Sequence, residues 1–183
     1  RVATDEQIAA AKAEDKITPQ MITLPILGED FTEWNYPATY ELLRRSGSDS
    51  WRIGDTARDY WKFTRPWLVD DRVKLHVSPI KIPSYPSGHT LTNHVWARIL
   101  SDLFPSKRVE LFRRADDVAN HRVIAGVHYP FDIIAGIKMA DATYCKMKSS
   151  PAYREAFIAA AEEIHANPPA NFPHGQGLLK ACH

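Results

Sequence analysis

The sequence predicts an all-α fold, organised as one bundle of about seven helices. Most segments place apolar side chains at helical spacing and are bounded by capping residues or prolines, and little of the chain favours a strand. The length of 183 residues indicates a single domain over residues 1–183. A domain of this size buries roughly 70% of its extended surface, which is enough for one core. No internal repeats are visible.

The predicted helices follow the chain in order. They cover residues 4–14, 30–45, 49–64, 87–104 and 106–126, a segment from 130, and residues 151–166. Thr4 and Gln7 form a capping box at the first start. Ser87 is expected to cap the long central helix, whose apolar stripe recurs every four residues. That stripe consists of Leu91, Val95, Ile99 and Leu103.

Prolines and small residues mark the expected interruptions. Pro37 is predicted to break or kink the second helix, Ser46-Gly47-Ser48 to form a turn, and Pro66 to end the third helix. The segment 67–86 lacks a helical period and is expected to be an ordered loop, with room for a short strand. Residues 167–183, rich in Pro and Gly, are expected to form a surface tail.

Composition excludes several classes of function. With 23 basic and 22 acidic residues the net charge is +1, so the basic excess of a nucleic-acid-binding protein is absent. No apolar run approaches the ~20 residues needed to cross a bilayer, so we expect no membrane insertion. Cys145 and Cys182 lack metal-binding spacing. Whether they pair or remain free stays open at this point.

The first chemical cluster is cationic. Arg58, Lys62 and Arg65 are spaced four and three residues apart, which places them on one face if the segment is helical. Such cations repel one another unless an anion lies between them. A solvated basic face is the alternative interpretation, and for this cluster alone it is the more common one.

The second cluster is a helix start that suits an anion. A helix that opens at Ser87-Gly88 directs free backbone N–H groups and the positive end of its dipole toward a phosphate. Gly88 permits close approach of the backbone, Ser87 adds a hydroxyl donor, and His89 is available to protonate a leaving oxygen. The alternative is a serine cap beside an incidental histidine.

The third cluster suits nucleophilic attack. Asp132 follows His128 by four residues, so its carboxylate can accept from one ring nitrogen and leave the other as a nucleophile. The planar fork of Arg122 suits two phosphate oxygens at once. Taken alone, such a pair is more commonly a capping aspartate beside a surface histidine.

The order and spacing of the three clusters resemble the signature of the type 2 phosphatidic acid phosphatase superfamily. That signature is Lys, six residues and Arg-Pro; then Pro-Ser-Gly-His; then Ser-Arg, five residues, His, three residues and Asp. The matching positions, with every spacing kept, are Arg58, Arg65 and Pro66, then residues 86–89, then His121, Arg122, His128 and Asp132. Residues 84–90 are most similar to the bacterial class A non-specific acid phosphatases.

Two positions depart from that signature. Arg58 stands where the family has Lys, and Lys62, one turn further, is a candidate to supply the ammonium group instead. His121 stands where the family has Ser. It is a candidate to bind phosphate, to orient Arg122 or to add a titrating group. Both changes bear on substrate preference and pH optimum.

The resemblance implies an acid phosphatase/vanadium haloperoxidase-like fold and a phosphomonoester hydrolase that needs no metal or other cofactor. In that reaction His128 attacks phosphorus to form a phosphohistidine, His89 acts as acid and then base, and Asp132 orients His128. Arg58, Arg65, Arg122, Ser87 and Gly88 bind the phosphate. Turnover should survive a chelator and be blocked by vanadate.

The resemblance also bears on the partners, the location and the alternative functions of the protein. It implies small phosphate esters as substrates and a periplasmic or secreted location, and phosphotransfer to an alcohol is compatible with the same residues. The apolar helix faces leave room for a homo-oligomer. The alternatives are a vanadate-dependent haloperoxidase, against which Arg58 argues, and a helical phosphate-binding protein without turnover.

Overall fold

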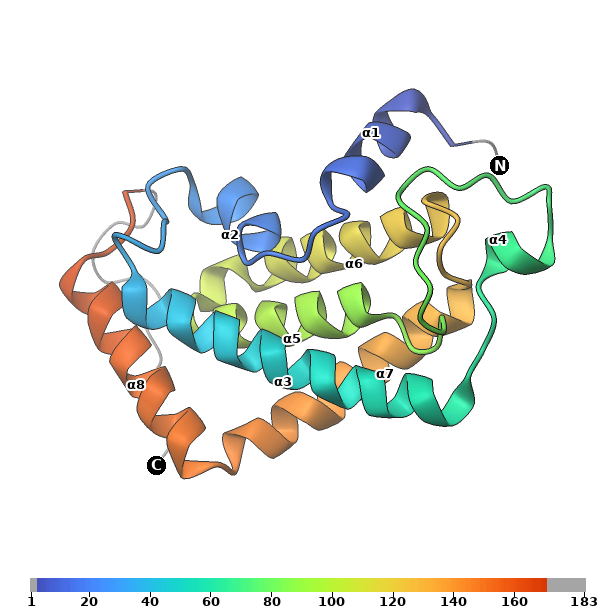
Figure 1. Ribbon diagram of the computed structural model, residues 1–183. Helices are drawn as coiled ribbons and strands as arrows, with labels where there is room; N and C mark the ends of the chain where they lie inside the picture. The colour runs from blue at the N-terminus through green and yellow to red at the C-terminus, as the bar shows by residue number, and fades with distance from the viewer. Residues whose placement is uncertain (1–2, 171–183) are drawn as a thin grey trace.

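The computed structural model describes residues 3–170, which fold into helices and connecting loops with no strand among them (Figure 1). Seven helices of eight residues or more are present within this range, and the prediction of an all-α fold is confirmed. They are α1 (Asp5–Ala13), α2 (Gln20–Leu27), α3 (Pro37–Trp61), α5 (Gly88–Leu103), α6 (Arg108–Ile124), α7 (Pro130–Lys148) and α8 (Pro151–Ala166). Two short elements, α4 (Pro66–Val69) and the 3₁₀ turn η1 (Pro105–Lys107), complete the set.

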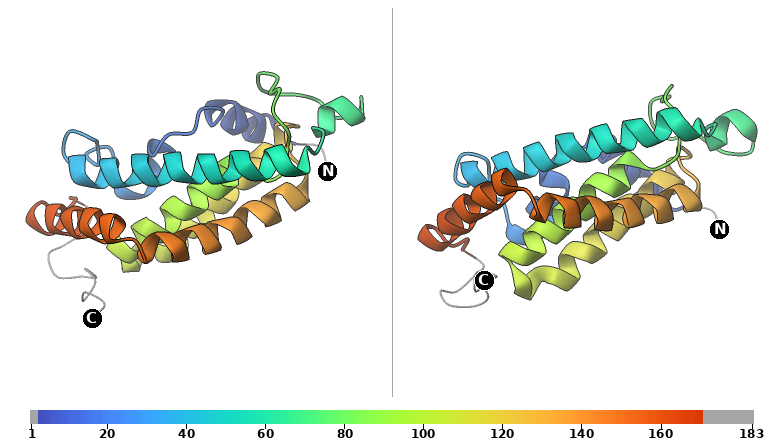
Figure 2. Two further views of the ribbon diagram at one scale, coloured as in Figure 1. Left: turned by 60° about the horizontal axis from the view of Figure 1, so that its bottom comes forward. Right: turned by 90° about the horizontal axis from the view of Figure 1, so that it is seen from below.

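Helix α5 lies at the centre of the bundle and packs against α3, α6 and α7. Its predicted apolar stripe is fully buried, from Leu91 to Leu103, and forms the middle of the main hydrophobic core. The remaining faces of α5 are also buried, because neighbouring helices surround it on several sides (Figure 2). Its start is capped as predicted, with the side chain of Ser87 accepting the backbone N–H of Thr90.

Helix α3 corrects the prediction of two helices joined by a turn. Ser46, Gly47 and Ser48 lie inside one continuous helix of 25 residues. Gly47 allows α3 to approach α5 closely, since a Cβ there would lie 2.7 Å from the Trp96 ring. The Trp96 indole N–H donates to the Leu43 carbonyl at 2.7 Å. The small residues therefore serve helix packing and not a turn.

The prolines of this region begin helices where breaks were expected. Pro37 occupies the first turn of α3, where its missing N–H costs nothing, so the helix begins at this residue and is not kinked there. Residues 30–36, which were predicted to be helical, are not. The third predicted helix ends at Trp61, before Pro66, and Pro66 starts α4. Helix α2 was not predicted, because its short apolar sequence contains Pro25 and shows no polar face.

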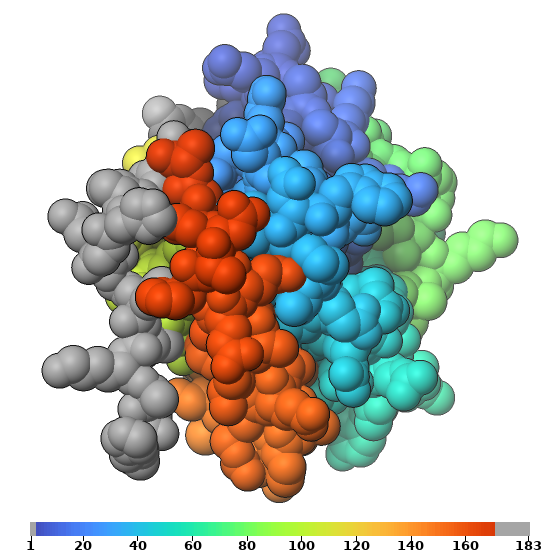
Figure 3. Space-filling view, turned by 90° about the vertical axis from the view of Figure 1, so that its left-hand side faces the viewer, coloured from blue at the N-terminus to red at the C-terminus, as the bar shows by residue number. Residues whose placement is uncertain are grey.

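One end of the bundle gathers four helix termini. The C-terminal ends of α3 and α6 and the N-terminal ends of α5 and α7 meet at the right of Figure 1, beside α1 and the loop before α5. Helix α8 lies near the opposite end, next to the start of α3 (Figure 3). There the Glu163 carboxylate accepts the backbone N–H groups of Ala38 and Thr39 at 2.7 and 2.9 Å.

The loop before α5 and the C-terminal tail were also predicted from the sequence. The segment between α4 and α5 is an ordered loop as predicted, and it contains no strand. Most of the predicted tail, residues 171–183 with Cys182, lies outside the described residues, whereas Cys145 is exposed on α7. Among residues 3–170, no helix combines the length and apolar character that a membrane span requires.

Candidate active site

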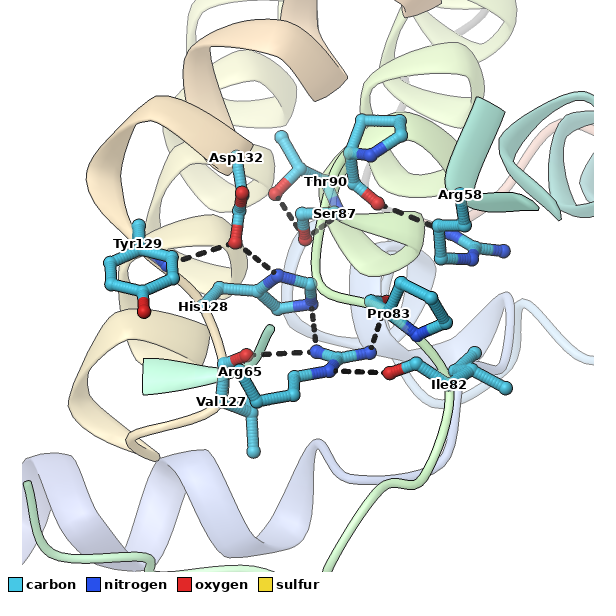
Figure 4. Close-up of polar contacts among 11 residues, drawn as sticks. Arg58, Arg65, Ile82, Pro83, Ser87, Thr90, Val127, His128, Tyr129 and Asp132 are labelled. Carbon is cyan, nitrogen blue, oxygen red and sulfur yellow. Dashed lines mark hydrogen bonds and ion pairs between the residues drawn. The ribbon is translucent and has the colours of Figure 1, made fainter. Parts of the chain in front are cut away.

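His128 and Asp132 form a buried pair at the start of α7. Nδ1 of His128 lies 3.0 Å from Oδ2 of Asp132, which also accepts the backbone N–H of Tyr129 at 2.9 Å (Figure 4). Because an ionised carboxylate only accepts hydrogen bonds, Nδ1 carries the hydrogen and Nε2 presents its lone pair. Burial raises the pKa of Asp132 to about 6, while the Tyr129 N–H, Ser84 and Arg65 act in the opposite direction.

Arg65 contacts the other nitrogen of this histidine. Its Nη1 lies 3.0 Å from Nε2 of His128 and 2.8 Å from the Val127 carbonyl oxygen. Nε and Nη2 donate to the carbonyl oxygens of Ile82 and Pro83 at 2.9 and 3.0 Å (Figure 4). Burial lowers the pKa of Arg65 to about 10, which leaves the guanidinium charged at physiological pH. Backbone oxygens thus hold a cation against the candidate nucleophile.

Arg58 approaches from the last turns of α3. Its Nη2 and Nε donate to Oδ1 of Asp55 at 2.6 and 3.2 Å, and its Nη1 donates to the Pro86 carbonyl at 3.2 Å. The guanidinium carbon lies 4.7 Å from the centre of a Trp51 ring, within range of a cation–π interaction. This buried arginine is therefore held on three sides at the entrance to α5.

The first turn of α5 lies against these groups. A Cβ at Gly88 would lie 2.7 Å from the Trp51 ring and 3.1 Å from Nη1 of Arg58, so any larger residue would displace one of these two side chains. The Ser87 hydroxyl accepts hydrogen bonds from Thr90, and both residues are buried. The positive end of the helix dipole and the free N–H groups of this turn favour an anion here.

His89 and Arg122 meet the segment that follows α1. Nε2 of His89 lies 3.1 Å from the carbonyl oxygens of both Glu14 and Asp15. Nη2 of Arg122 donates to the Asp15 carboxylate at 3.0 Å. The fully buried Arg122 therefore reaches from the end of α6 to the first connecting segment of the chain.

The pKa shifts reflect how closely these groups are gathered. Burial lowers the pKa of His128 well below 6.5, and the charges of Arg65, Arg122 and Arg58 lower it further. Burial likewise lowers the pKa of His89, with additional effects from Arg122 and His128. Positive charge from three helices and one loop converges on two neutral imidazoles, an environment that favours a bound anion.

The structure contradicts the prediction for Lys62, and it gives His121 a partner that the sequence did not indicate. Lys62 is exposed, with a left-handed backbone (φ 51°) that ends α3, so the predicted shared helix face with Arg58 and Arg65 does not exist. His121 is half-buried and places Nδ1 2.8 Å from the Glu14 carboxylate. The other eight sequence candidates gather at this end of the bundle. These are Arg58, Arg65, Ser87, Gly88, His89, Arg122, His128 and Asp132.

Glu14 and Asp15 are site residues without a detectable sequence motif, because they belong to no pattern shared with the three clusters. Ser84 lies in the segment 84–90 that resembles the acid phosphatases, but the sequence did not indicate that its buried hydroxyl acts on the pKa of Asp132. Asp55 carried a usable signal, because an acidic residue three positions before Arg58 on a helix predicts an ion pair. In the described part of the chain, no three His, Cys, Asp or Glu side chains are grouped as a metal site would require.

The comparison with protein families agrees with this geometry. Residues 53–148, more than half of the chain, match the PAP2 superfamily. The chain belongs to the PAP2 superfamily. The matched region contains all eight clustered site candidates and runs from the second half of α3 to the end of α7.

Curated relatives within bacteria refine the comparison. A non-specific acid phosphatase of Salmonella typhimurium is 27% identical over 146 residues, covering 77% of this chain and 58% of the relative. A non-specific acid phosphatase of Providencia stuartii is 26% identical, covering 75% and 57%. A lipid A 1-phosphatase of Rhizobium etli is 41% identical over 54 residues, covering 30% and 23%. The chain thus spans little more than half the length of the acid phosphatases that it matches.

Proposed function

We propose that the protein is a phosphomonoester hydrolase of the acid phosphatase type, working through a phosphohistidine without a metal ion. The observation that carries this proposal is the buried Asp132–His128 pair, whose unprotonated Nε2 is surrounded by the charges of three arginines. Membership of the PAP2 superfamily and the acid phosphatase relatives support the same reaction.

The nucleophile in this mechanism is Nε2 of His128. Its lone pair lies 3.0 Å from Nη1 of Arg65 in the described structure. When an ester binds, a phosphate oxygen takes over that N–H, and Nε2 is freed to attack phosphorus. The Nε2–P bond forms as the bond from phosphorus to the ester oxygen breaks. Asp132 stabilises the positive charge that develops on the ring, as a carboxylate does beside a catalytic imidazole.

The phosphate oxygens are held by preorganised donors. Arg58, Arg65 and Arg122 supply guanidinium groups, while Ser87 and the Gly88 N–H supply the start of α5. Phosphoryl transfer depends mainly on such positioning and neutralisation, and one well-placed donor contributes about 3 kcal/mol to lowering the barrier. The three cations here take the part that metal ions take in many phosphoryl-transfer enzymes.

His89 acts as the general acid and then as the general base. It donates to the departing ester oxygen in the first step, and it removes a proton from the water that hydrolyses the phosphohistidine in the second. Because burial lowers its pKa, the free protein holds His89 neutral at neutral pH. The negative charge of a bound phosphate raises that pKa again, and acidic solution increases the fraction of His89 that is protonated for catalysis. An alcohol in place of the water would give phosphotransfer.

Substrates are proposed to be small phosphate monoesters, and the location periplasmic or secreted, as for an exported enzyme. The decisive experiment is turnover of a panel of phosphate esters by the wild type and by His128→Ala. We expect the wild type to release phosphate with a chelator present, to be inhibited by vanadate, and to carry base-stable phosphate on His128 after rapid quenching. Equal hydrolysis by both proteins would refute the nucleophile.

A further inference from the structure

The segment directly after α1 contacts the site from a part of the chain that precedes the PAP2 match. Glu14 is its anchor. The Glu14 side chain is 7% exposed, and its two oxygens lie 2.6 Å from Nη2 of Arg114 and 2.8 Å from Nδ1 of His121, both on α6. These contacts lower the pKa of Glu14, against the effect of its burial. The carboxylate is therefore ionised and fastened to α6.

The backbone of this anchored segment determines how His89 can act. Nε2 of His89 lies 3.1 Å from two carbonyl oxygens, those of Glu14 and Asp15. A carbonyl oxygen only accepts, so Nε2 must carry a hydrogen. A neutral imidazole has a single N–H, which leaves Nδ1 as the nitrogen that exchanges a proton. The carbonyl pair thus selects the tautomer and fixes the ring plane.

We propose that Glu14 is a positioning residue for proton transfer by His89. This rests on the phosphatase mechanism above. By binding Arg114 and His121, Glu14 holds the two carbonyl oxygens on Nε2 and directs Nδ1 toward the ester oxygen. His121, which replaces the family serine, is thereby assigned a role in fastening the segment through Nδ1.

Charged and titratable groups of the described residues act on both partners. Burial lowers the pKa of His89, the charge of Arg122 and any charge on His128 lower it further, and the carbonyl contacts raise it. Arg114 and His121 face Glu14. Asp15 continues the segment and pairs with Arg122, so a loss common to both substrates reports on that arginine, whereas the ratio of the two substrates reports on His89.

A leaving-group comparison separates positioning of the acid from a general structural effect. A poor leaving group requires protonation as it departs, whereas a good one leaves nearly unaided. We therefore compare kcat/KM for phenyl phosphate, a poor leaving group, with kcat/KM for para-nitrophenyl phosphate, a good one. For Glu14→Ala we expect a loss of about 100-fold on the former and less than about fivefold on the latter, in line with typical general-acid effects.

Matched variants complete the test. Glu163→Ala removes a carboxylate that also holds backbone N–H groups, but near the far end of the bundle, and should leave the ratio of the two substrates unchanged. Glu14→Gln should recover most of the ratio, since its amide can still accept from Arg114 and hydrogen-bond to the His121 ring. Equal losses of Glu14→Ala on both substrates would overturn the proposal.

A spectroscopic measurement keeps the test independent of turnover. Nitrogen-15 NMR of His89 above its pKa should show the Nε2–H tautomer in the wild type and a mixture of tautomers in Glu14→Ala. An unchanged wild-type tautomer in Glu14→Ala would overturn the role of Glu14. An inactive wild-type chain would instead refute the phosphatase function, and the NMR result would still decide the positioning role.

Discussion

Oδ2 of Asp132 accepts two hydrogen bonds at once, from Nδ1 of His128 at 3.0 Å and from the backbone N–H of Tyr129 at 2.9 Å. The backbone bond fixes the carboxylate at the start of α7, and the carboxylate in turn fixes the imidazole. The tautomer of the candidate nucleophile therefore depends on where one helix begins.

Replacement of Asp132 by Asn tests this dependence. An amide N–H can occupy the position of Oδ2 and favour the wrong tautomer of His128, so we expect kcat to fall by about 10³- to 10⁴-fold with a smaller change in KM. The measurement is steady-state kinetics on para-nitrophenyl phosphate, with thermal unfolding to verify folding. A folded Asp132→Asn protein that keeps one tenth of the activity would contradict the assignment.

The two candidate cations of α3 should behave differently. Arg58 is buried and held by Asp55, Pro86 and Trp51, whereas Lys62 is exposed. We expect Arg58→Met to lower kcat/KM by about 10²- to 10³-fold, the typical cost of one preorganised donor. Lys62→Met should stay within about threefold of the wild type, since exposed charges contribute little. A large loss in Lys62→Met would contradict this prediction and indicate that Lys62 takes part in binding phosphate.

The pH dependence follows from the directions of the pKa shifts. As pH falls, protonation of Asp132, whose pKa lies at about 6, and then of His128 removes the nucleophile. As pH rises, His89 loses its proton, and its lowered pKa moves that loss to the acid side. We expect a bell-shaped kcat/KM profile with its maximum below about pH 6.5.

The variant His89→Asn is the control for the alkaline limb of that profile. In His89→Asn no group remains to lose the catalytic proton, so the fall in kcat/KM with rising pH should disappear while the acid limb persists. A wild-type profile that is flat from acid to mildly basic pH, or an unchanged alkaline limb in His89→Asn, would argue against His89 as the proton donor.

Anion binding should stabilise the fold without a metal ion. The three buried arginines repel one another when no anion lies between them, and the charge of Arg58 and Arg122 lowers the pKa of Arg65. Inorganic phosphate at about 100 times its Kd should stabilise the folded state by roughly 2.7 kcal/mol. Thermal unfolding in excess chelator measures this effect, and a requirement for added divalent cation would contradict metal independence.

The sequence predicted the structural features that depend on residues close together in the chain. Capping at Thr4 and Ser87, and the stripe from Leu91 to Leu103, involve neighbours within a few residues and were confirmed. The small residues at 46–48 misled the prediction, because a turn and a close helix contact favour the same residue types. Only the ring of Trp96, far along the chain, distinguishes the two.

The candidate site likewise contains residues that the sequence predicted and contacts that it did not. The spacing of Arg58, Arg65, His89, Arg122 and Asp132 was visible in the sequence, since the members of each cluster lie within about ten residues of one another. The contacts of Glu14 with His121 and of Asp15 with Arg122 span more than a hundred positions and leave no local pattern.

The sequence by itself determined the helical class, the order of the chemical groups and the family they resemble. Only the tertiary structure decided which cations are buried, which nitrogen of each histidine is engaged, and how the segment after α1 meets the site. The physical reason is that helix formation and capping depend on neighbours along the chain, whereas burial and charge coupling depend on neighbours in space.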